Sequence, residues 1–553
     1  MKSSSLDLLV VVALAGAGTL IVELSAVRLL APWFGTSSGV WTNVIGVILL
    51  ALACGYLAGA RLSLRPGPRR WLGSCLVLSG LATAWLPALA RPVAGWFLPS
   101  GIRLDQAAGL LTWGSLATSF LLFFPAAAVL GCIGPLAVEA LQRERGGHAG
   151  DAGGRVLAAS TLGSLAGTFA TTHVALPKLG LNTTFLATGG GLLVLGLWQA
   201  LVGARSEGGR RSSAGTVMLL ACAVGTAGAL FASRLSPPAR TDGAVVLEAR
   251  ETAYQSVRVV EDEGAPVPRR LEVNESFDSF QSVWQPGLGL LPWGYYYNHF
   301  ALPAAWSAAG AGPIESGPWN LCVLGLGAGT ALRVLEGTLQ SAGRELSATG
   351  IELDPGVVEL AQQWLDLAAS ETGGKPGEGA VDTRILGGLD ARAALRFDDR
   401  DYDQIVVDTY TNQVEIPPHL CTIEFFKEVR ERLVEGGWVS VNVGGFDLDD
   451  PVVDAVARTV ARAFEHKALA LRVPFARNVI VFARRSAEPP LPGTASFQVD
   501  LARAVGAAAL PGTWRLFEPE TEGAVLTDDL NPIELLQRRS IEEAEQRLAG
   551  WQP

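Results

Sequence analysis

The stretch that decides the fold is Leu321-Cys-Val-Leu-Gly-Leu-Gly-Ala-Gly-Thr330. It begins as an apolar run typical of a buried parallel strand and passes into a glycine-rich loop. Residues 331–339 then carry a helical pattern, and Glu345–Glu352 reads as the next strand. Strand, glycine loop, helix and strand in this order predict a doubly wound α/β domain of the Rossmann-like, methyltransferase type.

Acidic residues close the following strands of the predicted sheet. Glu352 ends the second strand and can hold both ribose hydroxyls of a nucleoside, because the glycines Gly325, Gly327 and Gly329 let the ligand approach the backbone. Asp390 follows a short third strand, where it can accept a hydrogen bond from an adenine amino group, and Asp408 ends a fourth. Any one acid could cap the next helix instead. Together they predict one nucleoside-binding crevice.

The residues before this domain predict a small β-subdomain over 244–310. Ala244–Val260 and Pro268–Val273 read as strands on either side of the turn-like segment 262–267. The catalytic domain is expected over 318–553.

The first half of the chain has a different composition. Residues 1–240 hold 17 basic and 7 acidic side chains, and the rest of the chain holds 26 and 46. Apolar runs long enough to cross a bilayer predict a multi-pass helical membrane domain over 1–235, with about seven spans. These are 6–30, 41–60, 71–89, 110–137, 156–175, 185–202 and 214–232.

The charge of the loops and the supply of the substrate predict opposite sides of the membrane for the catalytic domain. Arginine-rich loops alternate as cytoplasmic loops would, which leaves everything after residue 232 outside the cell membrane. A nucleoside substrate made in the cytoplasm requires the opposite, so the side of the catalytic domain stays open. A charge in hydrocarbon is costly, so we expect Glu23 and Arg28 in the first span to face the bundle interior, to pair with each other, or to reach the membrane interface. Dense small residues in the fifth and sixth spans favour close helix packing.

The cysteines and histidines show no metal-ligand spacing, so we expect no metal and no disulfide framework. The acidic second half argues against nucleic acid as a partner and suits a cationic substrate. A lipid bilayer is the expected environment, and a homodimer is compatible with the sequence.

The motifs resemble those of the spermidine synthase (polyamine aminopropyltransferase) family, and more closely its membrane-fused branch. The similar segments run in the family's order through both halves of the chain. They are Glu23 to Arg28-Leu-Leu-Ala-Pro-Trp-Phe-Gly, Glu251-Thr-Ala-Tyr-Gln-Ser-Val-Arg-Val, Leu324-Gly-Leu-Gly-Ala-Gly-Thr, Ile351-Glu-Leu-Asp-Pro, Leu389-Asp-Ala-Arg, Tyr402-Asp-Gln-Ile-Val-Val-Asp, Thr422-Ile-Glu-Phe-Phe, Glu435-Gly-Gly-Trp-Val and Thr527-Asp-Asp-Leu-Asn-Pro-Ile-Glu.

The resemblance implies transfer of an aminopropyl group from decarboxylated S-adenosylmethionine, a co-substrate, to putrescine or another polyamine, without a cofactor. It implies that Asp408 accepts the proton of the attacking amine. Gln255 and Gln281 would contact the donor together with the residues of the crevice. Tyr254, Tyr410 and Thr411 would bind the acceptor.

The acceptor region departs from the family pattern. A second aspartate three residues after the catalytic one is replaced by Thr411, and the acidic gate is replaced by Trp293-Gly-Tyr-Tyr-Tyr-Asn-His. The donor pocket is therefore expected to be kept and the acceptor pocket rebuilt. Asp528 and Asp529 either restore acidity near the crevice or cap the helix that begins near Pro532.

Two other functions remain open from the sequence. The same fold serves methyltransferases that use S-adenosylmethionine itself. A non-enzymatic membrane transporter or sensor of polyamines is the other, with Glu23 as its best support.

Overall fold

The computed structural model divides into two compact units, a helical unit at the beginning of the chain and an α/β unit in its second half. The residues that the structure describes are 2–34, 38–97, 108–146, 148–206, 225, 244–252, 254–273, 282–307, 317–367, 382–410, 415–474, 476–491, 505 and 512–549.

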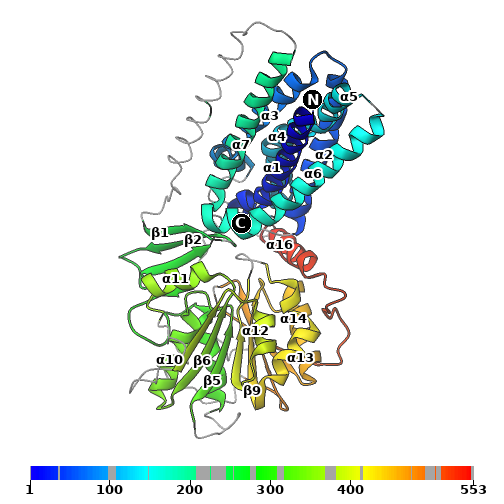
Figure 1. Cartoon of the computed structure of the whole chain (residues 1–553). Helices are drawn as coiled ribbons and strands as arrows, with labels where there is room; N and C mark the ends of the chain where they lie inside the picture. The colour runs from blue at the N-terminus through cyan, green and yellow to red at the C-terminus, as the bar shows by residue number, and fades with distance from the viewer. Residues whose placement is uncertain are drawn as a thin grey trace. The chain divides into compact units, whose positions relative to one another are not determined.

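The first unit is a bundle of long helices (Figure 1). Five apolar stretches in its described part are long enough to cross a membrane: Leu6–Ala31, Gly39–Ser63, Pro68–Phe97, Trp113–Arg145 and Lys178–Val202. They overlap five of the seven expected spans. The helices are α1 (Lys2–Phe34), α2 (Ser38–Ser63), α3 (Pro68–Phe97), α4 (Ala108–Gly131), α5 (Ile133–Arg145), α6 (Ala149–Ala170) and α7 (Leu176–Ser206).

Two expected spans have a different outcome. The stretch 156–175 is helical, as α6 and the π-helical turn η2 (Thr171–Ala175), but it is not among the five candidates. The stretch 214–232 lies outside the described residues apart from Gly225. Glycines do bring helices together as expected, since a Cβ on Gly189 would lie 2.6 Å from the carbonyl oxygen of Gly80.

The predicted strand over 244–260 is wrong as one element, because it is broken in two. Thr252 Oγ1 accepts hydrogen bonds from the N–H groups of Tyr254 and Gln255, and this side-chain turn interrupts the ladder. A four-stranded sheet in the order β1-β2-β3-β4 results. Its strands are β1 (Val245–Glu251), β2 (Ser256–Glu261), β3 (Arg269–Val273) and β4 (Ser282–Trp284). The subdomain boundary at residue 310 stays a prediction.

The larger sheet has eight strands in the order β12-β10-β11-β9-β8-β5-β6-β7. The strands β9, β8, β5, β6 and β7 pair in parallel, and β11 is antiparallel to β9. This is the predicted methyltransferase-type α/β fold. The strands are β5 (Trp319–Leu324), β6 (Leu346–Glu352), β7 (Asp382–Gly387), β8 (Tyr402–Val407), β9 (Leu433–Gly444), β10 (Ala468–Arg472), β11 (Asn478–Arg484) and β12 (Trp514–Phe517).

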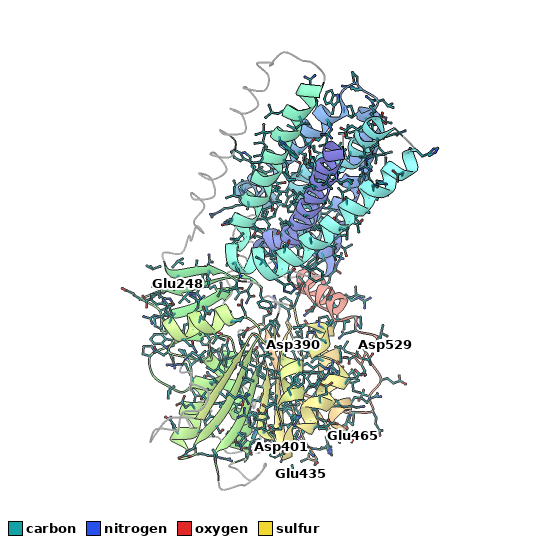
Figure 2. The ribbon with its side chains drawn as sticks, in the orientation of Figure 1. Glu248, Asp390, Asp401, Glu435, Glu465 and Asp529 are labelled. Atoms are coloured by element: carbon teal, nitrogen blue, oxygen red, sulfur yellow. The ribbon has the colours of Figure 1, made fainter. Side chains whose placement is uncertain are left out.

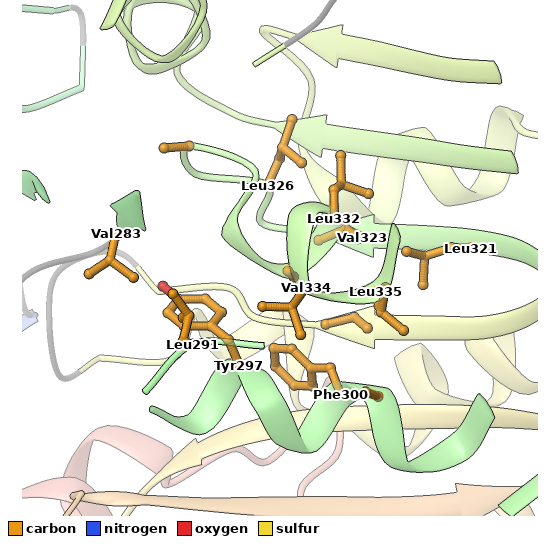
Figure 3. Close-up of a cluster of buried hydrophobic side chains, with 14 of the residues drawn as sticks. Val283, Leu291, Tyr297, Phe300, Leu321, Val323, Leu326, Leu332, Val334 and Leu335 are labelled. Carbon is orange, nitrogen blue, oxygen red and sulfur yellow. The ribbon is translucent and has the colours of Figure 1, made fainter. Parts of the chain in front are cut away.

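Helices cover both faces of this sheet and bury two apolar clusters. One face packs against α10, α11 and the short segments η3 and α9, and the other packs against α12, α13 and α14. Figure 3 shows Tyr297 and Phe300 of η3 facing Val334 and Leu335 of α10. The bounds are η3 (Tyr296–Ala301), α9 (Leu302–Trp306), α10 (Thr330–Ser341), α11 (Pro355–Trp364), α12 (Ala391–Phe397), η5 (Pro418–Leu420), α13 (Ile423–Glu431), α14 (Pro451–Phe464) and α16 (Ile533–Ala549).

The chain reverses its direction of travel across the sheet between β5 and β8. From β5 it continues outward through β6 to β7, and it then returns to β8 on the other side of β5. Ligands of open α/β sheets bind beyond the carboxyl ends of the strands at such a switch point. The loops that follow β5, β6, β7 and β8 are therefore where the site is to be sought.

Candidate active site

Asp408 follows β8 directly, and two uncharged donors hold its carboxyl group. The hydroxyl of Tyr296 donates to Oδ2 at 3.0 Å, and Nδ2 of Asn442 donates to Oδ1 at 2.7 Å. Asn478 fixes the orientation of this amide, because its Nδ2 donates to Asn442 Oδ1 at 2.9 Å. Burial raises the pKa of Asp408 to about 6, although the two hydrogen bonds act in the opposite direction. The group is thus poised to take up a proton near neutral pH.

The glycine loop runs beside Asp408. Gly325 has a φ of +83°, and a Cβ there would collide with the backbone carbonyl of Asp408, so this position tolerates only glycine. The N–H of Asp408 donates to the carbonyl of Leu324 at 2.9 Å. Gly329, also at positive φ, is the N-cap residue directly before α10. The loop and the aspartate are therefore in direct contact at the switch point.

Glu352 lies at the end of β6 and accepts a hydrogen bond from the glycine loop. Its Oε2 accepts the N–H of Gly327 at 2.8 Å, and its Oε1 accepts the N–H of Asp354 at 3.1 Å. Burial raises the pKa of Glu352 despite these hydrogen bonds. Each carboxylate oxygen has a second lone pair that can accept a ribose hydroxyl.

Asp390 caps helix α12 and also contacts a histidine. Its Oδ1 accepts the N–H of Ala393 at 3.0 Å, and its Oδ2 lies 2.8 Å from Nε2 of His419. Burial opposes ionisation here, but the hydrogen bonds from Ala393 and His419 prevail and lower the pKa of Asp390. Figure 2 shows Asp390 at the opposite end of the larger sheet from Asp401, which precedes β8.

Backbone contacts connect the strand ends with one another. The N–H groups of Gly325 and Leu326 donate to the carbonyl of Ile351, and the N–H of Gly388 donates to the carbonyl of Glu352. The glycine loop, Glu352, Asp390 and Asp408 thus all lie at the carboxyl ends of neighbouring parallel strands. The structure brings these predicted residues to the same edge of the sheet.

Tyr410 uses its hydroxyl group to brace β9. The hydroxyl donates to the carbonyl of Asn442 at 3.1 Å and accepts the N–H of Gly444 at 2.7 Å. Burial raises its pKa. Its predicted part in acceptor binding stays a prediction. Thr411, the other predicted acceptor contact after β8, lies outside the described residues.

The predicted contacts from the smaller sheet are placed only in part. Tyr254 and Gln255 lie in the turn between β1 and β2, and Tyr254 is exposed. Gln281 lies outside the described residues, directly before β4. Their roles toward donor and acceptor stay predictions.

The prediction that Asp528 caps the helix near Pro532 is wrong, and its contribution to the acidity of the crevice stays a prediction. Its two carboxylate oxygens accept from Arg392 at 2.7 and 2.8 Å, and the resulting ion pair compensates its charge. Asn531 caps α16 instead, because its Oδ1 accepts the N–H of Ile533 at 3.1 Å. Asp529 is exposed at the surface (Figure 2).

Sequence reasoning missed four residues of this site: Tyr296, Asn442, Asn478 and His419. One signal was present, since Asn442 and Ser440 are the two polar side chains in the buried run Trp438–Val443 of β9. Tyr296 lies in the aromatic segment that replaces the family's acidic gate. Asn478 and His419 became significant only through contacts with residues far away in the chain.

Sequence comparison finds named relatives. The chain is 29% identical to polyamine aminopropyltransferase 2 of Streptomyces coelicolor, in a match that covers 86% of this chain and 81% of the relative. It is 28% identical to a probable polyamine aminopropyl transferase of Bifidobacterium longum over 48% of this chain. That match spans 56% of the relative, little more than half its length. No protein-family model matches the chain.

Among solved structures, a probable spermidine synthase from Corynebacterium glutamicum matches with a TM-score of 0.39 and 18% identity. The match covers 53% of this chain and 98% of that chain. The Streptomyces match extends through most of this chain. The sequence comparisons therefore confirm the resemblance of this chain to the polyamine aminopropyltransferases.

Proposed function

We propose that this chain is a membrane-bound aminopropyltransferase that uses decarboxylated S-adenosylmethionine as donor and putrescine or another polyamine as acceptor. The similarity to named polyamine aminopropyltransferases supports a transferase. The observation that carries the chemical assignment is the carboxyl group of Asp408. It is largely buried, held by two neutral donors, and positioned beside a glycine loop at the switch point of the sheet.

The proposed reaction is a displacement at carbon. The nitrogen of a neutral amine attacks the aminopropyl methylene next to the donor's sulfonium, a new C–N bond forms, and the C–S bond breaks. The electron pair of that bond goes to sulfur, so methylthioadenosine leaves as a neutral thioether. The attacking nitrogen loses a proton to Asp408, which passes it to solvent. The sulfonium is itself a good leaving group, so we propose no metal cofactor.

The donor is assigned to the strand ends. Glu352 would accept the ribose hydroxyls with the lone pairs that the glycine loop leaves available, and Asp390 would accept the adenine amino group. Holding both ends of the nucleoside fixes the reacting carbon in front of Asp408. Such alignment supplies much of the rate of a reaction between two substrates.

Incubation of the purified full-length protein in detergent with labelled donor and a panel of amines tests this proposal. We expect methylthioadenosine and an aminopropylated amine. Asp408→Asn should reduce turnover at least about 100-fold, in line with the loss of a general base. Asp401→Asn is a matched control, because Asp401 is exposed at the other end of β8 (Figure 2), and it should retain activity.

Other outcomes contradict the proposal. Methyl transfer from S-adenosylmethionine without use of the decarboxylated donor would identify a methyltransferase. Full turnover by Asp408→Asn would remove the assigned base. A loss of turnover in Asp408→Asn cannot be attributed to misfolding if the variant melts at or above the wild-type temperature.

We also propose that the helical unit anchors the enzyme in the cell membrane. Its five candidate spans and its exposed leucines, such as Leu57 and Leu157, suit contact with lipid. Fusion of a fluorescent protein and, separately, of alkaline phosphatase after residue 553 reports the side of the α/β unit. Fluorescence without phosphatase activity indicates the cytoplasm, where the donor is made, and the reverse result indicates the outer side.

A further inference from the structure

His419 and Asp390 form a side-chain pair at the edge of the predicted nucleoside crevice. Nε2 of His419 lies 2.8 Å from Oδ2 of Asp390, while Oδ1 takes the N–H of Ala393. Hydrogen bonds to both oxygens fix the plane of the carboxylate. The side chains remain 50% and 37% exposed, so one side of the pair is open to a ligand. Each oxygen can accept a further hydrogen bond there.

The position of His419 is set by residues from two other segments. Its backbone carbonyl accepts a hydrogen bond from Nη1 of Arg392 at 3.2 Å. The carbonyl of the preceding Pro418 accepts from Nδ2 of Asn531 at 2.6 Å. These contacts hold the short turn η5 and bring the imidazole to Asp390. Asn531 belongs to the segment Thr527–Asn531, which we call the closing segment.

The closing segment also supplies an ion-pair partner for Arg392. Arg392 is buried, with 7% of the residue exposed, and lies two residues after Asp390 in the chain. Asp528 binds it through both oxygens, and Glu428 accepts from it at 2.7 Å. Thr422 Oγ1 in turn donates to Asp528 at 2.7 Å. Because Asp528 and Glu428 bind its guanidinium, Arg392 does not compete with a ligand for Asp390.

We propose that His419 is a positioning residue for the donor, and that the closing segment builds this end of the site. His419 holds the Asp390 carboxylate in the orientation that accepts the exocyclic amino group of adenine. Asn531 and Asp528 act through it, by fixing the turn that carries His419 and by binding Arg392. This inference rests on the proposed function and deepens it, since it names what selects the adenine base.

Discrimination between two nucleosides tests the inference without catalysis. Binding of methylthioadenosine and of methylthioinosine to the full-length protein is measured by calorimetry. The second nucleoside presents a carbonyl oxygen in place of the amino group, and that oxygen is repelled by a carboxylate. Wild-type protein should prefer methylthioadenosine. His419→Ala should weaken its binding about three- to tenfold, the effect of one lost hydrogen bond, and should reduce the preference.

A conservative variant separates positioning from general damage. His419→Gln retains an N–H donor and should recover part of the affinity and of the preference. Asp528→Asn should lower both the affinity for methylthioadenosine and the preference for it, because Arg392 then keeps only Glu428 as an anionic partner. Asp529→Asn is the matched control in the same segment, and it should bind as wild type. Unchanged affinity and unchanged preference in His419→Ala would mean that the side-chain pair has no role in binding, and would overturn the inference.

The test distinguishes this inference from the proposed function. Wild-type protein that binds methylthioadenosine selectively, yet transfers no aminopropyl group, refutes the proposed reaction and leaves the role of His419 intact. Wild-type protein that binds neither nucleoside overturns the inference, and it removes the donor from the proposed function as well.

Discussion

Asn442 donates its side-chain N–H to Oδ1 of Asp408 at 2.7 Å, and so fixes which face of the carboxylate stays available to a substrate. The amide cannot flip without cost, because its own Oδ1 already accepts from Asn478. Tyr296 holds the other carboxylate oxygen. Asp408, the proposed proton acceptor, therefore has a defined orientation and a pKa that neighbouring residues can change.

Asn442→Leu should move the pH dependence of turnover. The hydrogen bond from Asn442 stabilises the carboxylate and lowers its pKa, so its loss raises the pKa of Asp408 above about 6. Asp408 must be ionised to accept a proton. The rise of kcat/KM with pH should therefore shift upward by about one unit, which a pH profile between 5 and 9 measures.

Asn478→Ala serves as the graded control for that profile. It leaves Asn442 in place but removes the partner that orients it. The shift should have the same direction and a smaller size. An unchanged profile in Asn442→Leu would show that another group governs the acidic limb.

Asp408→Asn should stabilise the folded protein while it reduces turnover. The folded-state pKa of Asp408 is raised above its usual value of 3.8, so wild-type stability falls as the pH rises through about 6 and the buried group ionises. Asparagine avoids that cost. We expect a gain on the order of 2 kcal/mol at pH 8 and a smaller gain at pH 5. Unfolding curves in detergent at both pH values measure it, and a gain that does not grow with pH contradicts the assignment.

Gly325→Ala should destabilise the α/β unit and weaken nucleoside binding. The substitution adds the strain of a positive φ and a clash with the carbonyl of Asp408. Gly343→Ala is the matched control, since it has a φ of +70° and nothing within 4 Å of the added Cβ. The control should cost about 1 kcal/mol and Gly325→Ala at least about twice that. Denaturant titration and methylthioadenosine binding compare the two, and equal losses would argue against a close approach at the loop.

Gln404→Leu should disturb Tyr296 from a distance. The side chain of Gln404 is fully buried in β8, where Nε2 donates to the carbonyl of Phe300 and to Ser440 Oγ. Leucine leaves these acceptors unpaired, at a cost of about 1–3 kcal/mol. Because Phe300 shares the short segment η3 with Tyr296, turnover should fall as well. Ser440→Ala removes one of the two acceptors without stranding the Gln404 amide, and it should have a smaller effect on both measurements.

The succession of strands along the chain, and the acidic residues at their ends, could be predicted from residues 321–408. Apolar runs that end in glycine or an acidic residue are local patterns, and parallel strands must place those ends along one edge of the sheet. The break of the expected strand at Thr252 was not visible in this way. A threonine that bonds to the N–H groups of Tyr254 and Gln255 looks, by composition, like an ordinary strand residue.

The sequence by itself determined the apolar helical half, the α/β half and the alignment of Glu352, Asp390 and Asp408, because periodicity and strand ends are local properties of the chain. Only the tertiary structure decided what holds these acids. Tyr296 is 112 residues from Asp408, and Asp528 is 136 residues from Arg392. Hydrogen bonds at such separations depend on how helices and loops pack on the sheet, and no local pattern records that packing.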